Sequence, residues 1–171
     1  MPVPTLLLSG TCGSGKSLIA LEVHDLLSEA GVGNVMIDLD ALTQHWPARQ
    51  PFNGDLKLQN LRVLWPNHRE HGATHLVLAG VLQERAELDG YHAAIPDAEI
   101  VVCRLLAPVA LRRERLRRRM PTGPGLDWHL RRTVELERIL DAEGAEDVTV
   151  VNDERPPREV AREVLARVGW M

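Results

Sequence analysis

The eight residues from Gly10 to Ser17 constrain the fold of this chain more than any other segment. They fit the pattern G-x-x-x-x-G-K-[ST] at every fixed position. The apolar run Thr5–Leu8 precedes them, and the amphipathic stretch Leu18–Leu27 follows. A strand, a glycine-rich turn and a helix in this order bind phosphate, because inward-pointing backbone N–H groups and the helix N-terminus meet at one place. An accidental glycine-rich turn is the less favoured alternative.

The loop also predicts how a nucleotide and a metal ion are held. Lys16 would reach the β- and γ-phosphates of ATP, and the Ser17 hydroxyl would be a ligand of Mg²⁺. The expected nucleotide-binding residues of the loop are Gly10, Thr11, Cys12, Gly13, Ser14, Gly15, Lys16, Ser17 and Leu18.

Length, charge and cysteine content narrow the class of protein. A chain of 171 residues suits one domain, which we expect to span residues 1–171. The formal net charge of −4 offers no general attraction to nucleic acid, and no apolar run is long enough to span a membrane. Cys12 and Cys103 have neither metal-ligand nor disulfide-framework spacing. Together with an N-terminus unlike a signal peptide, this predicts a cytoplasmic protein without nucleic-acid or membrane partners.

Short apolar runs alternate with amphipathic stretches along the whole chain. This alternation predicts a parallel sheet with helical crossovers, an α/β fold. The expected strands are Thr5–Ser9, Val35–Leu39, His75–Ala79, Glu99–Leu105 and Val148–Val151. The expected helices are Lys16–Glu29, Leu56–Glu70, Leu82–Leu88, Pro108–Arg119, Asp127–Glu143 and Pro157–Val168.

Two acids follow the second expected strand, and we expect them to take part in metal binding and catalysis. Ligands of parallel sheets bind beyond the carboxyl ends of the strands, where Asp38 and Asp40 lie. One carboxylate could hold Mg²⁺, and the other could accept a proton from an attacking hydroxyl. The alternative is that one of them caps the turn that follows, which would explain one acid and not both.

The third expected strand ends in Gly80, without the acid that holds the metal in many phosphate-loop NTPases. This argues against a motor, a transporter or a switch, and it leaves the metal to Ser17 and the two acids. Gly80 suits a place where substrate approaches closely, although an ordinary turn glycine is an equal alternative. Trp46 lies in the irregular segment after Asp40 and is a candidate wall for an acceptor.

Arginines crowd the stretch from Arg112 to Arg119, which leads into a loop rich in proline and glycine. We interpret residues 112–132 as a lid that brings arginines onto the phosphates and excludes water. Arg115 is our candidate for the base or the α- and β-phosphates, and Arg119 for the charge of the transition state. For any single arginine, a solvated helix surface is the plainer alternative.

These motifs, in this order, resemble the small-molecule kinases related to shikimate kinase, gluconate kinase, adenylylsulfate kinase and chloramphenicol phosphotransferase, in the adenylate-kinase-like group. The resemblance implies a three-layer P-loop NTPase fold with a parallel sheet in the order 2-3-1-4-5, a helical lid, and Mg-ATP as phosphoryl donor. It also implies Asp40 as the base, and Asn152 in the segment that lines the adenine pocket. Only one glycine, Gly80, follows strand three, which weakens shikimate as the acceptor.

One further residue is a candidate for the acceptor site. Arg62 is the best candidate to fix a carboxylate or phosphate of the acceptor, with Arg49 and Arg69 behind it, although a surface role is at least as plausible. We expect a monomer or homodimer that uses ATP and a small-molecule acceptor. The alternatives are a nucleotide kinase, which needs no base, a regulatory protein that only binds ATP, and a nucleic-acid kinase.

Overall fold

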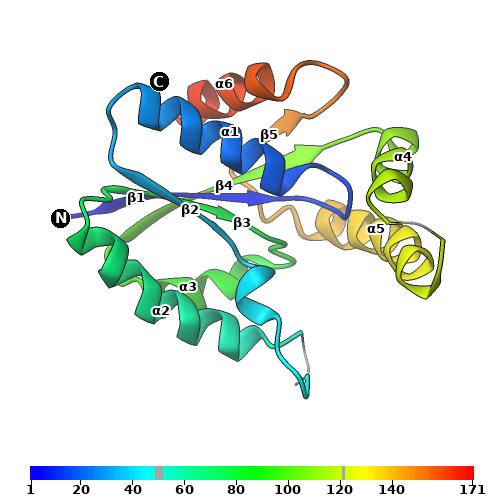
Figure 1. Ribbon diagram of the computed structural model, residues 1–171, viewed down its shortest axis with the longest axis horizontal. Helices are drawn as coiled ribbons and strands as arrows, with labels where there is room; N and C mark the ends of the chain where they lie inside the picture. Colours follow the sequence, from blue (N-terminus) through cyan, green and yellow to red (C-terminus); the bar gives the residue numbers. More distant parts are fainter. Residues whose placement is uncertain (49–51, 121) are drawn as a thin grey trace.

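A five-stranded, all-parallel sheet organises the molecule, with its strands in the order β2-β3-β1-β4-β5. The structure is a computed structural model and describes residues 1–48, 52–120 and 122–171. The strands are β1 (Val3–Ser9), β2 (Asn34–Asp38), β3 (His75–Ala79), β4 (Ala98–Leu106) and β5 (Val148–Val151). The strand order implied by the resemblance is confirmed. Because all the strands are parallel, their carboxyl ends share one edge of the sheet (Figure 1).

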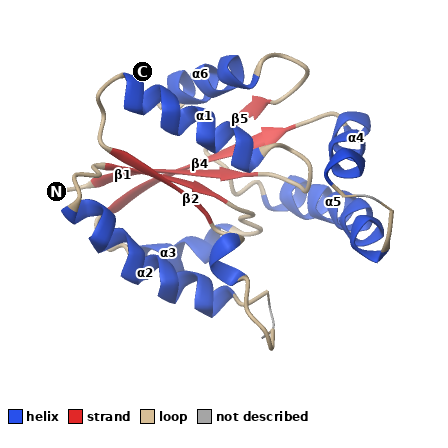
Figure 2. Cartoon of the chain, in the orientation of Figure 1, coloured by secondary structure: helices blue, strands red, loops and turns tan. Residues whose placement is uncertain are grey.

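Helices cover both faces of this sheet and complete three layers (Figures 1 and 2). One face carries α1 and α6, the other carries α2 and α3, and α4 and α5 lie where the strands end. The helices are α1 (Lys16–Glu29), α2 (Gly54–Glu70), α3 (Leu88–Ala94), α4 (Val109–Arg119), α5 (Pro124–Glu143) and α6 (Pro157–Arg167). Short 3₁₀ turns occupy Ala41–Thr43 and Arg85–Glu87. None of the helices in the described ranges is both long and apolar enough to cross a membrane.

The central strand β1 explains why the core has two halves. Leu6 and Leu8 pack with α1 and α6, whereas Leu7 lies between them in sequence and packs with α2 and α3. Successive side chains of a strand point to opposite faces, so a strand covered on both sides must be apolar throughout. Each fully buried leucine contributes about 1.5–3 kcal/mol to folding. The core thus fixes β1, and with it the start of the glycine-rich loop.

The prediction of a helix over Leu82–Leu88 is wrong. The backbone N–H of Leu82 donates to Ser9 Oγ at 3.0 Å, which ties this residue into a loop beside β1. The helical run begins later, because Glu84 and Glu87 form a capping box in which Glu87 Oε1 accepts from the N–H groups of Gln83 and Glu84. The capping box moves the helix start to Arg85, and α3 begins at Leu88.

The fully buried Arg112 ties α4 to the glycine-rich loop and to α5. Its Nη1 donates to Thr11 Oγ1 at 2.9 Å and to Thr133 Oγ1 at 3.3 Å, and its Nη2 donates to Glu137 Oε1 at 2.6 Å. Thr133 Oγ1 in turn donates to the carbonyl of Cys12 at 2.8 Å. The first residue of the predicted lid, Arg112, is therefore a fixed structural contact and not part of a mobile surface.

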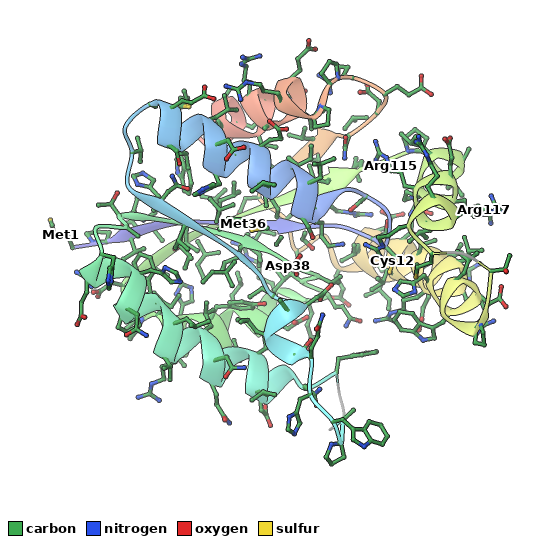
Figure 3. All side chains as sticks on the ribbon, in the orientation of Figure 1. Met1, Cys12, Met36, Asp38, Arg115 and Arg117 are labelled. Carbon is green, nitrogen blue, oxygen red and sulfur yellow. The ribbon has the colours of Figure 1, made fainter. Side chains whose placement is uncertain are left out.

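Replacing this buried guanidinium should destabilise the protein. Arg112→Met removes the donor and leaves Thr11, Thr133 and Glu137 without their partner. We expect the free energy of unfolding to fall by about 2–4 kcal/mol, less than for a wholly buried ion pair because water reaches the Glu137 carboxylate. Urea unfolding measures the change. Arg117→Met is the control, since Arg117 is exposed on the outer side of α4 (Figure 3), and it should change stability by about 0.5 kcal/mol or less. Equal changes in the two variants would contradict the assigned role of Arg112.

Candidate active site

The glycine-rich loop lies between the end of β1 and the first turn of α1, with its glycines in the backbone region that disfavours side chains. Gly13 has φ 79° and Gly15 has φ 91°. A Cβ at Gly13 would lie 2.7 Å from the carbonyl oxygen of Arg112, and one at Gly15 would clash with the Asn152 amide. Only glycine satisfies both the conformation and the close packing at these two positions. The predicted loop is therefore present and packed against α4 and the segment after β5.

Lys16 reaches back over this loop from the start of α1. Its Nζ donates to the carbonyl oxygens of Gly10 at 3.0 Å and Thr11 at 2.9 Å. Burial lowers the pKa of Lys16, while the nearby Asp40 and Asp38 carboxylates act in the opposite direction. The buried Ser14 hydroxyl forms no hydrogen bond within the described part of the chain. The loop thus holds the Lys16 ammonium group against two of its own carbonyl groups, and it buries a hydroxyl that has no partner among the described residues.

Asp38 joins the end of β2 to α1. Ser17 Oγ donates to Asp38 Oδ2 at 2.5 Å, and the backbone N–H of Asp40 donates to Asp38 Oδ1 at 3.0 Å. The hydroxyl and the carboxylate predicted to hold Mg²⁺ are therefore neighbours, on two elements far apart in sequence. Both are hard oxygen ligands, the kind that Mg²⁺ takes in proteins.

Asp40 has a different environment from Asp38. It precedes the 3₁₀ turn Ala41–Thr43, yet its side chain makes no capping hydrogen bond there. The carboxylate is exposed and lines a cavity, so capping does not account for it. The two acids predicted as a pair thus have different surroundings: Asp38 bonds to Ser17, whereas Asp40 faces the cavity.

The cavity next to Asp40 has a volume of about 680 Å³ and begins at Cys12 of the glycine-rich loop. One side comes from Leu39, Asp40 and the start of α2, a second from the loop after β3, and the third from one face of α5. The charged residues that line it are Asp40, Lys57, Glu84, Glu87, Arg132 and Glu143, together with His129. A cavity of this size and position, open to the phosphate loop, suits a second substrate.

Three predicted acceptor residues do not line this cavity among the described residues. Arg62 is exposed on α2, about 140° around the helix from the cavity-facing Lys57, so its side chain points elsewhere. Trp46 is 88% exposed, and Phe52 at the other end of the same segment lines the cavity instead. Gly80 leaves room for Leu39, whose Cδ1 would lie 2.7 Å from an added Cβ. Gly80 therefore positions a wall residue, and the further candidate Arg49 lies outside the described residues.

Asn152 and Arg115, predicted to bind the nucleotide, lie beside the glycine-rich loop. Asn152 Nδ2 donates to the Ser14 carbonyl at 2.7 Å, and Arg115 donates to the carbonyls of Asn152 at 3.4 Å and Asp153 at 2.9 Å. Arg119 is exposed at the last turn of α4, close enough to lower the pKa of Lys16 and of Cys12 electrostatically, although burial raises the Cys12 pKa more. Arg119 is thus within electrostatic reach of the loop.

Sequence reasoning missed Lys57 and Arg132 as cavity residues. Lys57 Nζ lies 5.2 Å from the centre of the Tyr91 ring, and Arg132 lies 5.4 Å from the centre of the Phe52 ring. Lys57 is one of only two lysines in the chain, and this rarity is the one sequence feature that could have identified it as a cavity residue. Arg132 lines the cavity only because of how α5 packs in the fold, and no short sequence pattern predicts that packing.

Comparisons with known proteins agree with this arrangement at the level of the fold. The sequence matches no protein-family model, and no curated protein matches it significantly. Solved structures match over nearly the whole chain. The tunicamycin resistance protein of Deinococcus radiodurans is 19% identical with a TM-score of 0.66, covering 99% of this chain and 97% of that one.

Two kinases match similarly. Shikimate kinase from Acinetobacter baumannii, solved with shikimate, is 18% identical with a TM-score of 0.60, covering 97% of this chain and 93% of that one. The APS kinase of Mycobacterium tuberculosis, solved with AMPPNP and APS, is 24% identical with a TM-score of 0.60, covering 99% of both chains. The resemblance to P-loop small-molecule kinases is therefore confirmed for the fold: this chain has their three-layer α/β architecture and strand order.

Proposed function

We propose that the protein is an ATP-dependent kinase that transfers the γ-phosphoryl group to a hydroxyl of a small metabolite or antibiotic-like molecule. One observation carries the proposal: the uncapped Asp40 carboxylate lines the cavity that opens beside Cys12 of the phosphate loop. An attacking hydroxyl must lose its proton, and a carboxylate between the two substrates is the group that can accept it. The architecture shared with shikimate kinase and APS kinase supports the same reaction class.

The loop residues fit the nucleotide and the metal that this reaction needs. Lys16 and the backbone of the loop would hold the β- and γ-phosphates. Ser17 and Asp38 would hold Mg²⁺, directly or through water. Bound there, Mg²⁺ would neutralise charge on the phosphates and orient them.

The remaining predicted residues would act around this centre. Arg115 and Asn152, which contact each other beside Ser14 and Gly15, would border the base and α-phosphate. Arg119 would stabilise the charge of the transition state once the last turn of α4 moves inward. Phosphoryl transfer depends mainly on positioning and electrostatic neutralisation, and these residues would supply both.

Removal of the proposed base should separate chemistry from nucleotide binding. In Asp40→Asn, the side chain keeps its size and loses its proton affinity, so turnover of an alcohol acceptor should fall about 10²–10⁴-fold. The KM for ATP should stay within about threefold of the unaltered value, because Asp40 is proposed to contact the acceptor. ADP release, screened with pooled hydroxylated metabolites and with nucleoside- and aminoglycoside-type antibiotics, measures both. Asp55→Asn is the control, since Asp55 is an exposed acid of α2 outside the cavity lining.

The same assay distinguishes the alternatives. Unchanged turnover in Asp40→Asn would favour a nucleotide kinase, whose acceptor is already an anion and needs no base. Slow ATP loss that no acceptor stimulates would favour a regulatory protein that binds ATP.

The metal-holding role of Ser17 gives a separate prediction. Ser17→Ala removes the hydroxyl and breaks its 2.5 Å hydrogen bond to Asp38. The Mg²⁺ concentration for half-maximal ADP release should therefore rise about 10–100-fold, the range found when groups that orient metal ligands are lost. Ser28→Ala is the matched control, because the Ser28 hydroxyl bonds to the carbonyl of His24 on α1. A magnesium response that is the same in both variants would show that Ser17 has no part in the metal site.

A further inference from the structure

The cavity beside Asp40 continues well beyond the point where phosphoryl transfer would occur. Along α5 its wall runs from Trp128 through Arg132, Leu136 and Ile139 to Glu143. These residues share one face of the helix, and Arg132 and Glu143 are separated by roughly 16 Å of helix axis. The cavity is therefore a trough along α5, and the region next to Asp40 is part of it.

The C-terminal half of α5 forms one wall of the trough. Ion pairs hold this half in place, so the wall does not depend on closure of a lid. On another stripe of α5, Glu137 Oε1 accepts from the buried Arg112 at 2.6 Å, and Asp141 Oδ1 accepts from the buried Arg104 at 2.6 Å. These ion pairs fix the half of α5 that carries Leu136, Ile139 and Glu143. The length of the trough thus belongs to the resting structure.

Apolar groups cover much of this trough. Leu39 and Val81 lie on one side and Leu136 and Ile139 on the other. The rings of Phe52 and Trp128, 6.5 Å apart and tilted by 59°, lie at the end near α2 and the start of α5. Burial of aliphatic or aromatic surface would therefore supply much of the affinity for a ligand here.

Lys57 is the one described lysine in the lining, and it contacts an aromatic ring. The ammonium group lies over the Tyr91 ring, at 5.2 Å from its centre. Burial lowers the pKa of Lys57, and the carboxylates of Glu87 and Asp40 act against that shift by stabilising the ammonium form. An anionic ligand would have to compete with these two carboxylates for Lys57.

The one described arginine in the lining is also engaged. Arg132 Nη1 pairs with Glu135 at 2.8 Å, its Nη2 donates to Gln83 Oε1 at 3.3 Å, and its guanidinium lies over the Phe52 ring. Only 13% of its side chain is exposed. Arg132 therefore shapes the wall and has little capacity left to bind an acceptor anion.

The carboxylates that line the trough exceed its cations. Asp40, Glu84, Glu87 and Glu143 face one lysine and one arginine among the described lining residues. Glu84 and Glu143 are exposed and form no ion pair within the described chain. A carboxylate or phosphate on the ligand would meet this excess of negative charge, with Lys57 as the one described lining cation that is not in an ion pair.

We infer that the acceptor is an elongated alcohol with an apolar body and no anionic group. This inference rests on the proposed function for the reaction, but its geometry concerns only what the trough binds. The hydroxyl would lie at Asp40, and the apolar body would lie along Leu136 and Ile139. A volume of about 680 Å³ accommodates a ligand of drug size, larger than a single sugar acid.

Three glycosides test charge and length separately. Octyl β-D-glucoside has a neutral head and an apolar body, octyl β-D-glucuronide differs by a carboxylate, and methyl β-D-glucoside lacks the body. Their dissociation constants are measured by calorimetry below the micelle-forming concentration, with AMPPNP and Mg²⁺ present. We expect the glucuronide and the methyl glucoside each to bind at least about tenfold more weakly than octyl glucoside.

Variants of lining residues test whether the trough causes the preference for glucoside over glucuronide. Glu84→Gln combined with Glu143→Gln removes two lining charges and should reduce the preference for glucoside over glucuronide about threefold or more. Glu70→Gln combined with Glu99→Gln, two exposed acids outside the lining, is the matched control and should leave the preference unchanged. Ile139→Asp places a carboxylate on the apolar wall and should weaken octyl glucoside binding about tenfold.

The outcomes distinguish this inference from the proposed function. Equal or tighter binding of the glucuronide, equal binding of the methyl glucoside, or binding of none of the three would overturn the inference and leave the kinase proposal standing. Conversely, if the expected preferences are found but no alcohol in the ADP-release screen is phosphorylated, the kinase proposal fails and the assigned ligand class stands.

Discussion

The buried guanidinium of Arg112 is the contact on which the rest of the site depends. It is bonded to the phosphate loop through Thr11 and to α5 through Thr133 and Glu137. A buried arginine is costly to desolvate, so it is retained where several hydrogen bonds compensate it. Here those bonds join two surfaces with different proposed tasks: the loop that would hold the phosphoryl donor and the helix that would form a wall of the acceptor site. The proposed donor and acceptor sites are thereby held together by one set of buried contacts.

A second junction completes that frame on the opposite side of the loop. Asp38 ends β2 and accepts from Ser17 at the start of α1, and its other oxygen accepts from the backbone of Asp40. The local turn at Asp38 thus sets the position of Asp40 as well. Because Gly80 has no side chain, Leu39 packs against β3 between the two acids. Small changes at Gly80 would therefore be transmitted to both acids without any contact to a substrate.

How much of this could be predicted depends on how local each signal is. The loop Gly10–Ser17 and the strand His75–Ala79 were predictable because spacing and apolar runs determine them. The helix expected at Leu82 was misplaced because a hydrogen bond from Leu82 to Ser9, distant in sequence, overrides local propensity. Lys57 and Arg132 were missed for a related reason. Only the packing of α2 and α5 around the cavity brings these residues together, and no short pattern reports helix packing.

The arginines of α4 have different physical roles, although they are close together in the sequence. Arg112 is buried in the first half of α4, and Arg115, one turn later, is bonded to the backbone after β5, so both are held in place. Arg119 forms no hydrogen bond or ion pair within the described residues and lies near Lys16 electrostatically. Leu116 is buried against the glycine-rich loop, so only movement of the residues after it would cost few contacts, whereas movement of the first turn of α4 would break the Arg112 network. Any closure over the phosphates should therefore begin after Leu116, so a mobile lid, if residues 112–132 form one, would be shorter than that segment.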